Sequence, residues 1–213
     1  MDKKLLFLIN HDWTCPALDR LMAVMSSAAF WTVPLVLLAI VLCVRGGFKA
    51  RTFLAVALIA IGVSDGVFGN TIKHAVSRLR PHQSEVGVRT LDLASPAWRG
   101  LFQPLKQKTS LGTEVDRPGN SFPSNHAANT TAAALITALL WRQRGWLAFI
   151  PALIVSYSRI YIGAHWPSDV LAGICVGLAA GLLALLLAEL VWRRWGARIA
   201  PRIAAQNPTL LFA

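Results

Sequence analysis

Cysteine and acidic side chains are scarce in this sequence. Of its 213 residues 3 are cysteine, and Cys15, Cys43 and Cys175 are too scattered to suggest a disulfide framework or a closely spaced set of metal ligands. Cys43 and Cys175 fall within apolar stretches, where we expect plain buried thiols. The 10 acidic residues are outnumbered by 21 lysines and arginines, which gives a net charge of +11.

Charged residues of either sign make up 15% of the chain, whereas 55% of it is hydrophobic and its mean hydropathy is +0.52. This balance excludes an ordinary soluble domain and indicates a membrane protein. Five segments are long and apolar enough to cross a bilayer: 28–44, 52–70, 125–141, 146–162 and 168–192. We therefore expect an all-α fold, in which residues 1–213 form a single polytopic transmembrane helical bundle.

The positive charge is distributed as membrane topology requires, so it does not indicate a nucleic-acid partner. Basic residues fill the turn after the first span, the turn after the third span and the segment after the fifth: Arg45, Lys49, Arg51, Arg142, Arg144, Arg193, Arg194, Arg198 and Arg202. The positive-inside rule places these three regions in the cytoplasm. The other helix ends then face the periplasm of a bacterial inner membrane.

Two segments outside the spans also belong to that outer face. Residues 1–26 mix apolar and charged side chains and predict one or two interfacial helices; their short apolar run, with no small-residue cleavage pattern, does not suggest a signal peptide. Residues 82–120 are polar and too long for a simple turn, so we expect a cap over the outer face. Its basic residues either attract an anionic headgroup or form a solvated surface: Arg89, Arg99, Lys106, Lys108 and Arg117.

The second span contains an ionisable side chain, Asp65, which is a functional signal inside a membrane. Lys73 follows eight residues later, about two helical turns away on the same face. Asp65 is therefore either a partner that orients Lys73 or a structural residue bonded to a Ser or Thr of a neighbouring span.

A first polar motif follows that span. We expect its helix to continue through Lys73 and to stop at Pro81. Lys73 and Arg80 are seven residues apart, so both would lie on one helix face and reach one anion. Alternatively, they are ordinary basic anchors at the end of a span.

The second motif, Ser121 to His126, directly precedes the third span. Ser124 then lies at a helix N-terminus, where free amides and the helix dipole favour a bound anion, and His126 lies in the first turn beside it. A serine that simply caps the helix is the structural alternative.

The third motif joins the last two spans. Arg159 supplies a planar, permanently charged fork for a phosphate-like anion. His165 and Asp169 are four residues apart, so if Pro167 opens a helix, the carboxylate can accept one ring N–H and leave the other nitrogen free to attack. In the structural alternative, this is an interface loop whose His and Asp cap helix ends.

All three motifs converge on the outer face, and together they resemble the type 2 phosphatidic acid phosphatase superfamily, which includes bacterial membrane lipid phosphatases. The resemblance runs from Lys73 to beyond Asp169, with Asn125 where the family usually has glycine. It assigns family roles to Lys73, Arg80, Pro81, Ser124, His126, Ser158, Arg159, His165 and Asp169, and at Asn125 to the backbone amide.

The resemblance implies metal-independent hydrolysis through a phosphohistidine and no cofactor. His165 would attack phosphorus, His126 would protonate the departing oxygen, and Asp169 would hold the imidazole tautomer. The remaining histidines lack partners for a metal site: His11, His74 and His82. The expected substrate is undecaprenyl diphosphate, with lipid A 1-phosphate and phosphatidylglycerophosphate as alternatives.

Two other functions use the same cradle of positive charge. Vanadium haloperoxidases share this cluster of cations, but they are soluble proteins, and the five apolar spans of this chain argue against that function. A non-catalytic lipid-phosphate binding or transport protein would need the cations alone, so the two histidines with Asp169 favour an enzyme. We expect the bilayer and a lipid phosphate as partners, with no nucleic acid and no obligate protein partner.

Overall fold

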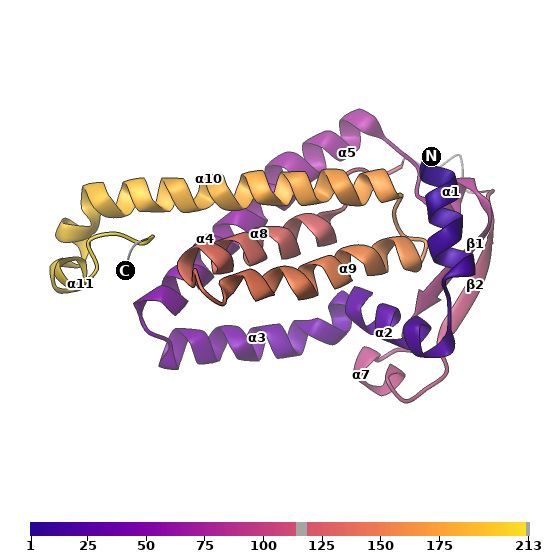
Figure 1. Ribbon diagram of the computed structural model, residues 1–213, viewed down its shortest axis with the longest axis horizontal. Coiled ribbons are helices and arrows are strands. Elements are labelled where there is room, and N and C mark those ends of the chain that lie inside the picture. Colours follow the sequence, from indigo (N-terminus) through magenta and orange to yellow (C-terminus); the bar gives the residue numbers. More distant parts are fainter. Residues whose placement is uncertain (114–118, 212–213) are drawn as a thin grey trace.

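The computed structural model describes residues 1–113 and 119–211, without the side chains of residues 67–70. Five long helices run side by side in a bundle (Figure 1): α3 (Ala28–Arg45), α4 (Phe48–Val63), α8 (Asn125–Leu140), α9 (Phe149–Tyr161) and α10 (Pro167–Ile199). The N-terminal helices and a β-hairpin cover one end of the bundle. The 3₁₀ turn η3 (Gly145–Ala148) joins α8 to α9, and α11 (Pro201–Gln206) follows α10 at the opposite end.

These five helices lie where the sequence predicts the five spans. Within the described residues, three segments are long and apolar enough to cross a membrane: Ala28–Arg45, Phe48–Ser84 and Pro167–Ile199. The helices at the predicted third and fourth spans are shorter, with 16 residues in α8 and 13 in α9. Helix α8 is rich in alanine and packs against α4, α9 and α10, which its small residues allow.

The outside of the bundle is apolar. Helix α3 has no buried residue in the isolated chain, and its leucines, valines and isoleucines point outward, as a lipid-facing helix requires. Cys43 on α3 and Cys175 on α10 are exposed on this outer surface, and Cys15 is exposed near the N-terminus. The expectation that the thiols of Cys43 and Cys175 are buried within protein is therefore wrong, since their helices turn these faces outward.

Small residues allow α8 and α10 to touch along their backbones. A Cβ atom added to Gly173 would lie 2.5 Å from the Ser124 carbonyl oxygen, and one added to Gly177 would lie 2.2 Å from that of Ala128. Because no side chain separates the helices, the Ser124 amide reaches the Asp169 carbonyl oxygen at 3.0 Å. The N-terminal ends of α8 and α10 are thereby fixed next to each other.

The predicted continuous helix up to Pro81 is wrong. A π-helical segment, η2 (Ser64–Gly69), follows α4, and α5 (Asn70–Val76) ends before Ser77, which has a φ of 44°. The next residues bond to distant parts of the chain instead: the Arg78 carbonyl accepts the Ser121 amide, and the Leu79 carbonyl accepts the indole N–H of Trp166. Lys73 and Arg80 therefore do not share a helix face, and Pro81 opens a new short helix, α6 (Pro81–Ser84).

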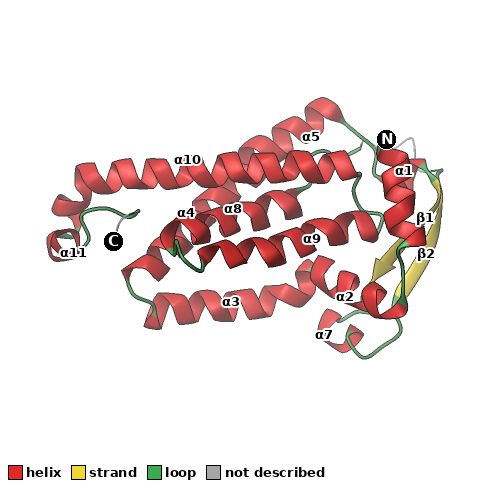
Figure 2. Cartoon of the chain, viewed as in Figure 1, coloured by secondary structure: helices red, strands yellow, loops and turns green. Residues whose placement is uncertain are grey.

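The polar segment that was expected to form a cap contains a β-hairpin, so the all-α prediction is wrong there (Figure 2). Strands β1 (Val86–Asp92) and β2 (Lys106–Leu111) pair antiparallel, with α7 (Ala97–Gly100) between them. Val88 and Leu91 are the buried residues of β1, while β2 is almost entirely exposed. Arg117, one of the basic residues expected in the cap, lies outside the described residues.

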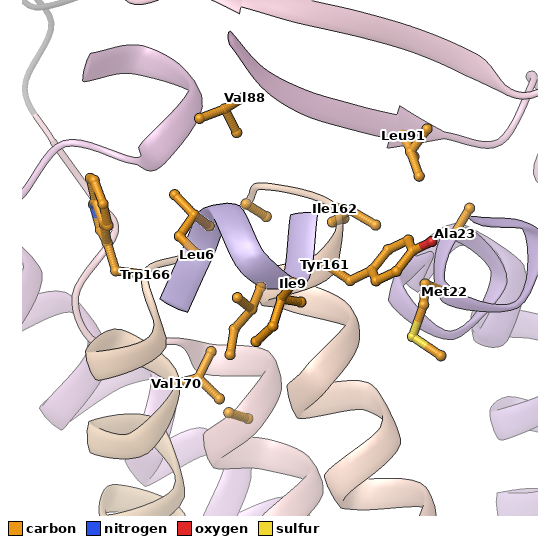
Figure 3. Close-up of a cluster of buried hydrophobic side chains, with 13 residues drawn as sticks. Leu6, Ile9, Met22, Ala23, Val88, Leu91, Tyr161, Ile162, Trp166 and Val170 are labelled. Atoms are coloured by element: carbon orange, nitrogen blue, oxygen red, sulfur yellow. The ribbon is translucent and has the colours of Figure 1, made fainter. Parts of the chain in front are cut away.

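The N-terminal segment forms a layer between this hairpin and the bundle: α1 (Asp2–Phe7), η1 (Leu8–Asp12) and α2 (Pro16–Ser26). Figure 3 shows Leu6 and Ile9 between Val88 of the hairpin and the bundle. The fully buried Asn10 donates from Nδ2 to the carbonyl oxygens of Arg89, at 2.9 Å, and Tyr161, at 2.6 Å. The apolar side of this segment is thus covered by protein, and Asn10 ties β1 to the end of α9.

The glycine contacts give a test of the α8–α10 packing. Gly177→Ala should cost about 1–3 kcal/mol, because the new methyl group overlaps the α8 backbone. Gly62→Ala is the matched control in α4, since nothing lies within 4 Å of the added methyl group and alanine favours helix. Thermal unfolding in one detergent should show a midpoint lowered by several degrees for Gly177→Ala alone. Equal midpoints for the two variants would contradict this packing.

Candidate active site

The residues singled out in the sequence gather at the end of the bundle that the N-terminal layer covers. They lie on four pieces of backbone: α5 with the segment after it, the start of α8, the end of α9 with the loop that follows, and the start of α10. As predicted, Ser124 immediately precedes α8 and Pro167 opens α10. Two helix N-termini therefore lie beside the loop that carries His165.

The loop between α9 and α10 is held by backbone contacts. Gly163 has a φ of 68°, and a side chain there would clash with Val88 and Arg89 of β1, so this position requires glycine. The amides of Ala164 and His165 both donate to the carbonyl oxygen of Arg159, at 3.0 and 3.1 Å. His165 consequently has a fixed backbone position directly beneath the hairpin.

The His165 imidazole is buried, and its Nδ1 lies 2.8 Å from the Ser121 carbonyl oxygen. Because a carbonyl oxygen can only accept, Nδ1 carries the proton and Nε2 is left with a free electron pair. The nearest Asp169 oxygen is 3.8 Å from Nδ1, beyond hydrogen-bond range. The expected direct bond from His165 to Asp169 is therefore wrong, although the predicted tautomer is compatible with this geometry.

Asp169 instead organises the backbone and side chains around His165. Its fully buried carboxylate accepts the Trp166 amide at 3.0 Å and the Ser121 hydroxyl at 2.5 Å. Its other oxygen accepts Nη1 of Arg78 at 2.7 Å. Arg78 is not among the site residues predicted from the sequence, because the predicted continuous helix gave it no special position and Lys73 and Arg80 were the expected anion ligands.

The surroundings of His165 favour its neutral form. Burial lowers the pKa of His165 to about 4; Asp169 opposes the shift, and the positive charges of Arg159 and Arg80 add to it. At neutral pH the imidazole therefore needs no base to remove a proton from Nε2 before it attacks an electrophile.

Several hydrogen-bond donors here have unused capacity. The buried Arg159 donates through Nη1 to the Ser26 carbonyl and hydroxyl oxygens, but its Nε has no partner among the described residues. The buried Ser124 hydroxyl likewise has none among them. Arg80 donates from Nε to Asn120 at 3.0 Å, and within residues 1–113 and 119–211 its terminal nitrogens make no further hydrogen bond. Unpaired donors beside the amides at the start of α8 suit a phosphate-like anion.

His126 lies in the first turn of α8, and Asn125 is the first residue of that helix. The groups close enough to act electrostatically on the His126 imidazole include the other predicted site residues: Arg159, His165, Arg80 and Lys73. The three sequence motifs thus converge, including Lys73, even though α5 ends before Arg80.

Asp65 and Ser158 make contacts that the sequence did not predict. The Asp65 carboxylate accepts Nδ2 of Asn129 on α8 at 3.0 and 3.2 Å, so its neighbouring-helix partner is an amide rather than a Ser or Thr. It also lies within electrostatic range of Lys73, and an orienting role for Asp65 stays a prediction. The Ser158 hydroxyl donates to the Val155 carbonyl of its own helix at 2.7 Å.

Two cavities of opposite character meet at this site. A polar cavity of about 560 Å³ lies under the hairpin and is lined by residues that include Arg80, Arg159 and Lys108. An apolar groove of about 400 Å³ is lined mainly by α3, α8 and α9, and His126 and Trp31 contribute to its wall. Ser27 belongs to both. The cationic and apolar spaces are therefore adjacent.

Comparisons with known proteins agree with this arrangement. The PAP2 superfamily matches residues 50–193. An undecaprenyl-diphosphatase of Sulfolobus acidocaldarius is 30% identical over 132 residues, covering 61% of this chain and 53% of that protein. A lipid A 4'-phosphatase of Bacteroides thetaiotaomicron is 27% identical over 181 residues, covering 83% and 72% respectively. The chain thus spans about half the length of the first relative and more of the second.

Among solved structures, the crystal structure of Aquifex aeolicus LpxE shares the fold. The TM-score is 0.60 at 22% sequence identity, and the alignment covers 86% of this chain and 94% of that chain.

The lowered pKa of His165 predicts a stability that depends on pH. Between about pH 6.5 and 4, His165 binds a proton in the unfolded chain but not in the folded one. The folded state is therefore not penalised by this residue above about pH 6.5, and the free energy of unfolding decreases as the pH falls from 6.5 toward 4. From pH 7 to 4.5 the loss should be about 2–3 kcal/mol. His165→Asn keeps a donor for the Ser121 carbonyl and should remove this part of the acid sensitivity.

Thermal unfolding of both proteins at pH 4.5, 7 and 8.5 checks this expectation. The wild type should lose more stability than His165→Asn between pH 7 and 4.5, and the two should run parallel from pH 7 to 8.5. An equal acid loss would mean that His165 is not the group responsible.

Proposed function

The chain belongs to the PAP2 superfamily, and from this premise we propose that it is an integral-membrane lipid phosphatase that cleaves undecaprenyl diphosphate through a phosphohistidine. The observation that carries the proposal is the meeting of the polar cavity with the apolar groove. A lipid phosphate has the matching form, an anion joined to an apolar chain. Arg80 and Arg159 would bind the anion while the groove takes the chain, and His126 lies in the wall of that groove.

In the proposed first step, Nε2 of His165 attacks phosphorus. The new P–N bond to the terminal phosphorus forms as the P–O bond between the two phosphates breaks, the lipid monophosphate departs, and protonated His126 gives a proton to the departing oxygen. In the second step His126 accepts a proton from water, the water oxygen attacks phosphorus, and the P–N bond breaks to release inorganic phosphate. No metal enters either step.

Positive charge and neutral donors would stabilise the transition state of both steps. Lys73, Arg80 and Arg159, whose charges all act on His126, would bind the equatorial phosphate oxygens together with the Ser124 hydroxyl and the Asn125 amide. Asp169 would act through Ser121, whose carbonyl oxygen holds the His165 tautomer. A binding or transport protein would need the cations but not this orientation of an imidazole, which favours catalysis.

The apolar groove suits a hydrocarbon chain, and the name of the Sulfolobus relative agrees with an isoprenoid diphosphate. The Bacteroides relative is named for lipid A, so lipid A 1-phosphate remains an alternative substrate, as does phosphatidylglycerophosphate. Phosphate release from each purified lipid, with and without EDTA, distinguishes these substrates. Activity abolished by EDTA and restored by a divalent metal would contradict the proposed mechanism.

For the whole chain we propose five spans in a bacterial inner membrane, with the active site in the periplasm. Helices α8 and α9 are about 24 and 20 Å long at 1.5 Å per residue, which is shorter than the hydrocarbon core of about 30 Å. The turn and η3 that join them would extend both helices to the cytoplasmic surface of the membrane. Arg142 and Arg144 in this turn would lie at the cytoplasmic side.

Replacing the two histidines should affect monophosphates and diphosphates differently. A lipid monophosphate expels a basic alkoxide-like oxygen, so His126→Ala should slow its cleavage by about 10²- to 10⁴-fold. The matching diphosphate expels a weakly basic phosphate monoester and should be slowed much less. His165→Ala should abolish both reactions, because no nucleophile remains.

Single-turnover rates on both substrates measure the chemical step free of product release. Equal losses for His126→Ala on the two substrates would show that His126 positions phosphate rather than donating a proton. If both the wild type and His165→Ala bind the lipid and neither hydrolyses it, the enzyme proposal fails and a lipid-phosphate binding protein is the function that the result supports.

The proposed orientation predicts which surface cysteines an impermeant thiol reagent reaches. Gln107 on β2 and Gln143 after α8 are both exposed and form a matched pair at opposite ends of the bundle. In a background without the three native cysteines, Gln107→Cys should react in intact spheroplasts. Gln143→Cys should react only after lysis, and the reverse pattern would place the active site in the cytoplasm.

A further inference from the structure

Arg78 joins the N-terminal helix to the catalytic loop. Its Nη1 donates to the Asp169 carboxylate and to the Ser168 hydroxyl, each at 2.7 Å, and its Nη2 donates to the Asp2 carboxylate at 2.6 Å. The guanidinium also lies over the Trp166 ring, 5.1 Å from the centroid. One side chain therefore contacts three of the four residues 166–169 at the start of α10, all except Pro167, and it contacts α1 as well.

Asp2 completes this connection from the other side. Its Oδ1 accepts the backbone amide of Ser168 at 3.0 Å, and its Oδ2 accepts the Ser168 hydroxyl as well as Arg78. The Ser168 amide lies in the first turn of α10, where it has no partner within the helix and where the helix dipole favours a carboxylate. Asp2 thus caps the helix that begins two residues after His165.

The contacts of Arg78 close a ring around Ser121. The Arg78 carbonyl accepts the Ser121 amide at 2.9 Å, the Arg78 guanidinium binds Asp169, and Asp169 accepts the Ser121 hydroxyl. The remaining polar group of Ser121 is its carbonyl, which accepts Nδ1 of His165. The orientation of the imidazole thereby depends on Ser121, and the orientation of Ser121 depends on Arg78.

We propose that Arg78 is a positioning residue for the His165 nucleophile and that Asp2 extends its control to the N-terminal segment. This inference rests on the proposed function for its effect on turnover. Among the described residues, Arg78 is the one cation in hydrogen-bond contact with the fully buried Asp169. Removing it leaves a buried carboxylate without its charged partner, so the carboxylate and Ser121 must rearrange.

The test compares Arg78→Met, Arg78→Lys and Asp2→Asn with a control variant on α1, the helix that carries Asp2. Lys3→Ala is that control, because the exposed ion pair of Lys3 with Glu85 lies outside the ring. Arg78→Met should lower the single-turnover rate about 10- to 100-fold while KM changes less than about 3-fold. Arg78→Lys should recover part of the rate, Asp2→Asn should lose less than Arg78→Met, and Lys3→Ala should match the wild type.

A second measurement needs no turnover. The ¹⁵N chemical shifts of the His165 imidazole, followed against pH, measure its titration. The charged and titratable groups that act on this imidazole are Asp169, Arg80, Arg159 and His126. Without Arg78, the Asp169 charge acts on the imidazole less opposed, so the pKa of His165 should rise in Arg78→Met. A purely structural role for Arg78 would not move it.

Wild-type rate and unchanged His165 titration in Arg78→Met would overturn the proposal, as would losses in Lys3→Ala equal to those in Asp2→Asn. If Arg78→Met fails to fold, Arg78→Lys and Asp2→Asn must still show the graded loss, and its absence counts against the proposal. If the wild type hydrolyses no lipid phosphate, the proposed function fails, and the imidazole titration still decides whether Arg78 positions His165.

Discussion

The arrangement of the site depends on a buried negative charge, the carboxylate of Asp169. A carboxylate that is removed from water needs donors on every side, and each donor comes from a different part of the chain. Ser121 approaches from before α8, the Trp166 amide from the loop after α9, and Arg78 from the segment after α5. Satisfying this one group brings together the backbone pieces that carry the proposed phosphate-binding residues.

Close packing of α8 against α10 makes that convergence compatible with anion binding. With glycine at the contact, the N-termini of α8 and α10 lie beside each other. Asp2 caps the first turn of α10, so the space for an anion is the one that the first-turn amides and the dipole of α8 face. Arg159 and His165 occupy the same space from the α9 side, in surroundings that exclude water. Low dielectric strengthens each interaction with an anion, and it also keeps His165 neutral.

Local chemistry made much of the site predictable. Ser124 before a small-residue helix and Pro167 before an apolar one correctly predicted where α8 and α10 begin. Contacts between distant residues were not predictable in this way. The Ser121 carbonyl, 44 residues away in sequence, accepts the hydrogen bond from Nδ1 of His165 that the four-residue spacing had assigned to Asp169. Tertiary bonds to Arg78 and Leu79 likewise end a helix that local sequence would have continued.

The N-terminal layer and the hairpin were the least predictable part, because their main contacts are with each other and with the bundle. Asn10 is fully buried, yet nothing near it in sequence reveals its partners on β1 and α9. Ser26 of this layer holds Arg159, and Asp2 reaches Arg78. The imidazoles of His126 and His165 therefore belong to the bundle, while the layer fixes two of the cations near them. Since the same layer also walls the polar cavity, a change in its packing alters headgroup space and cation position together.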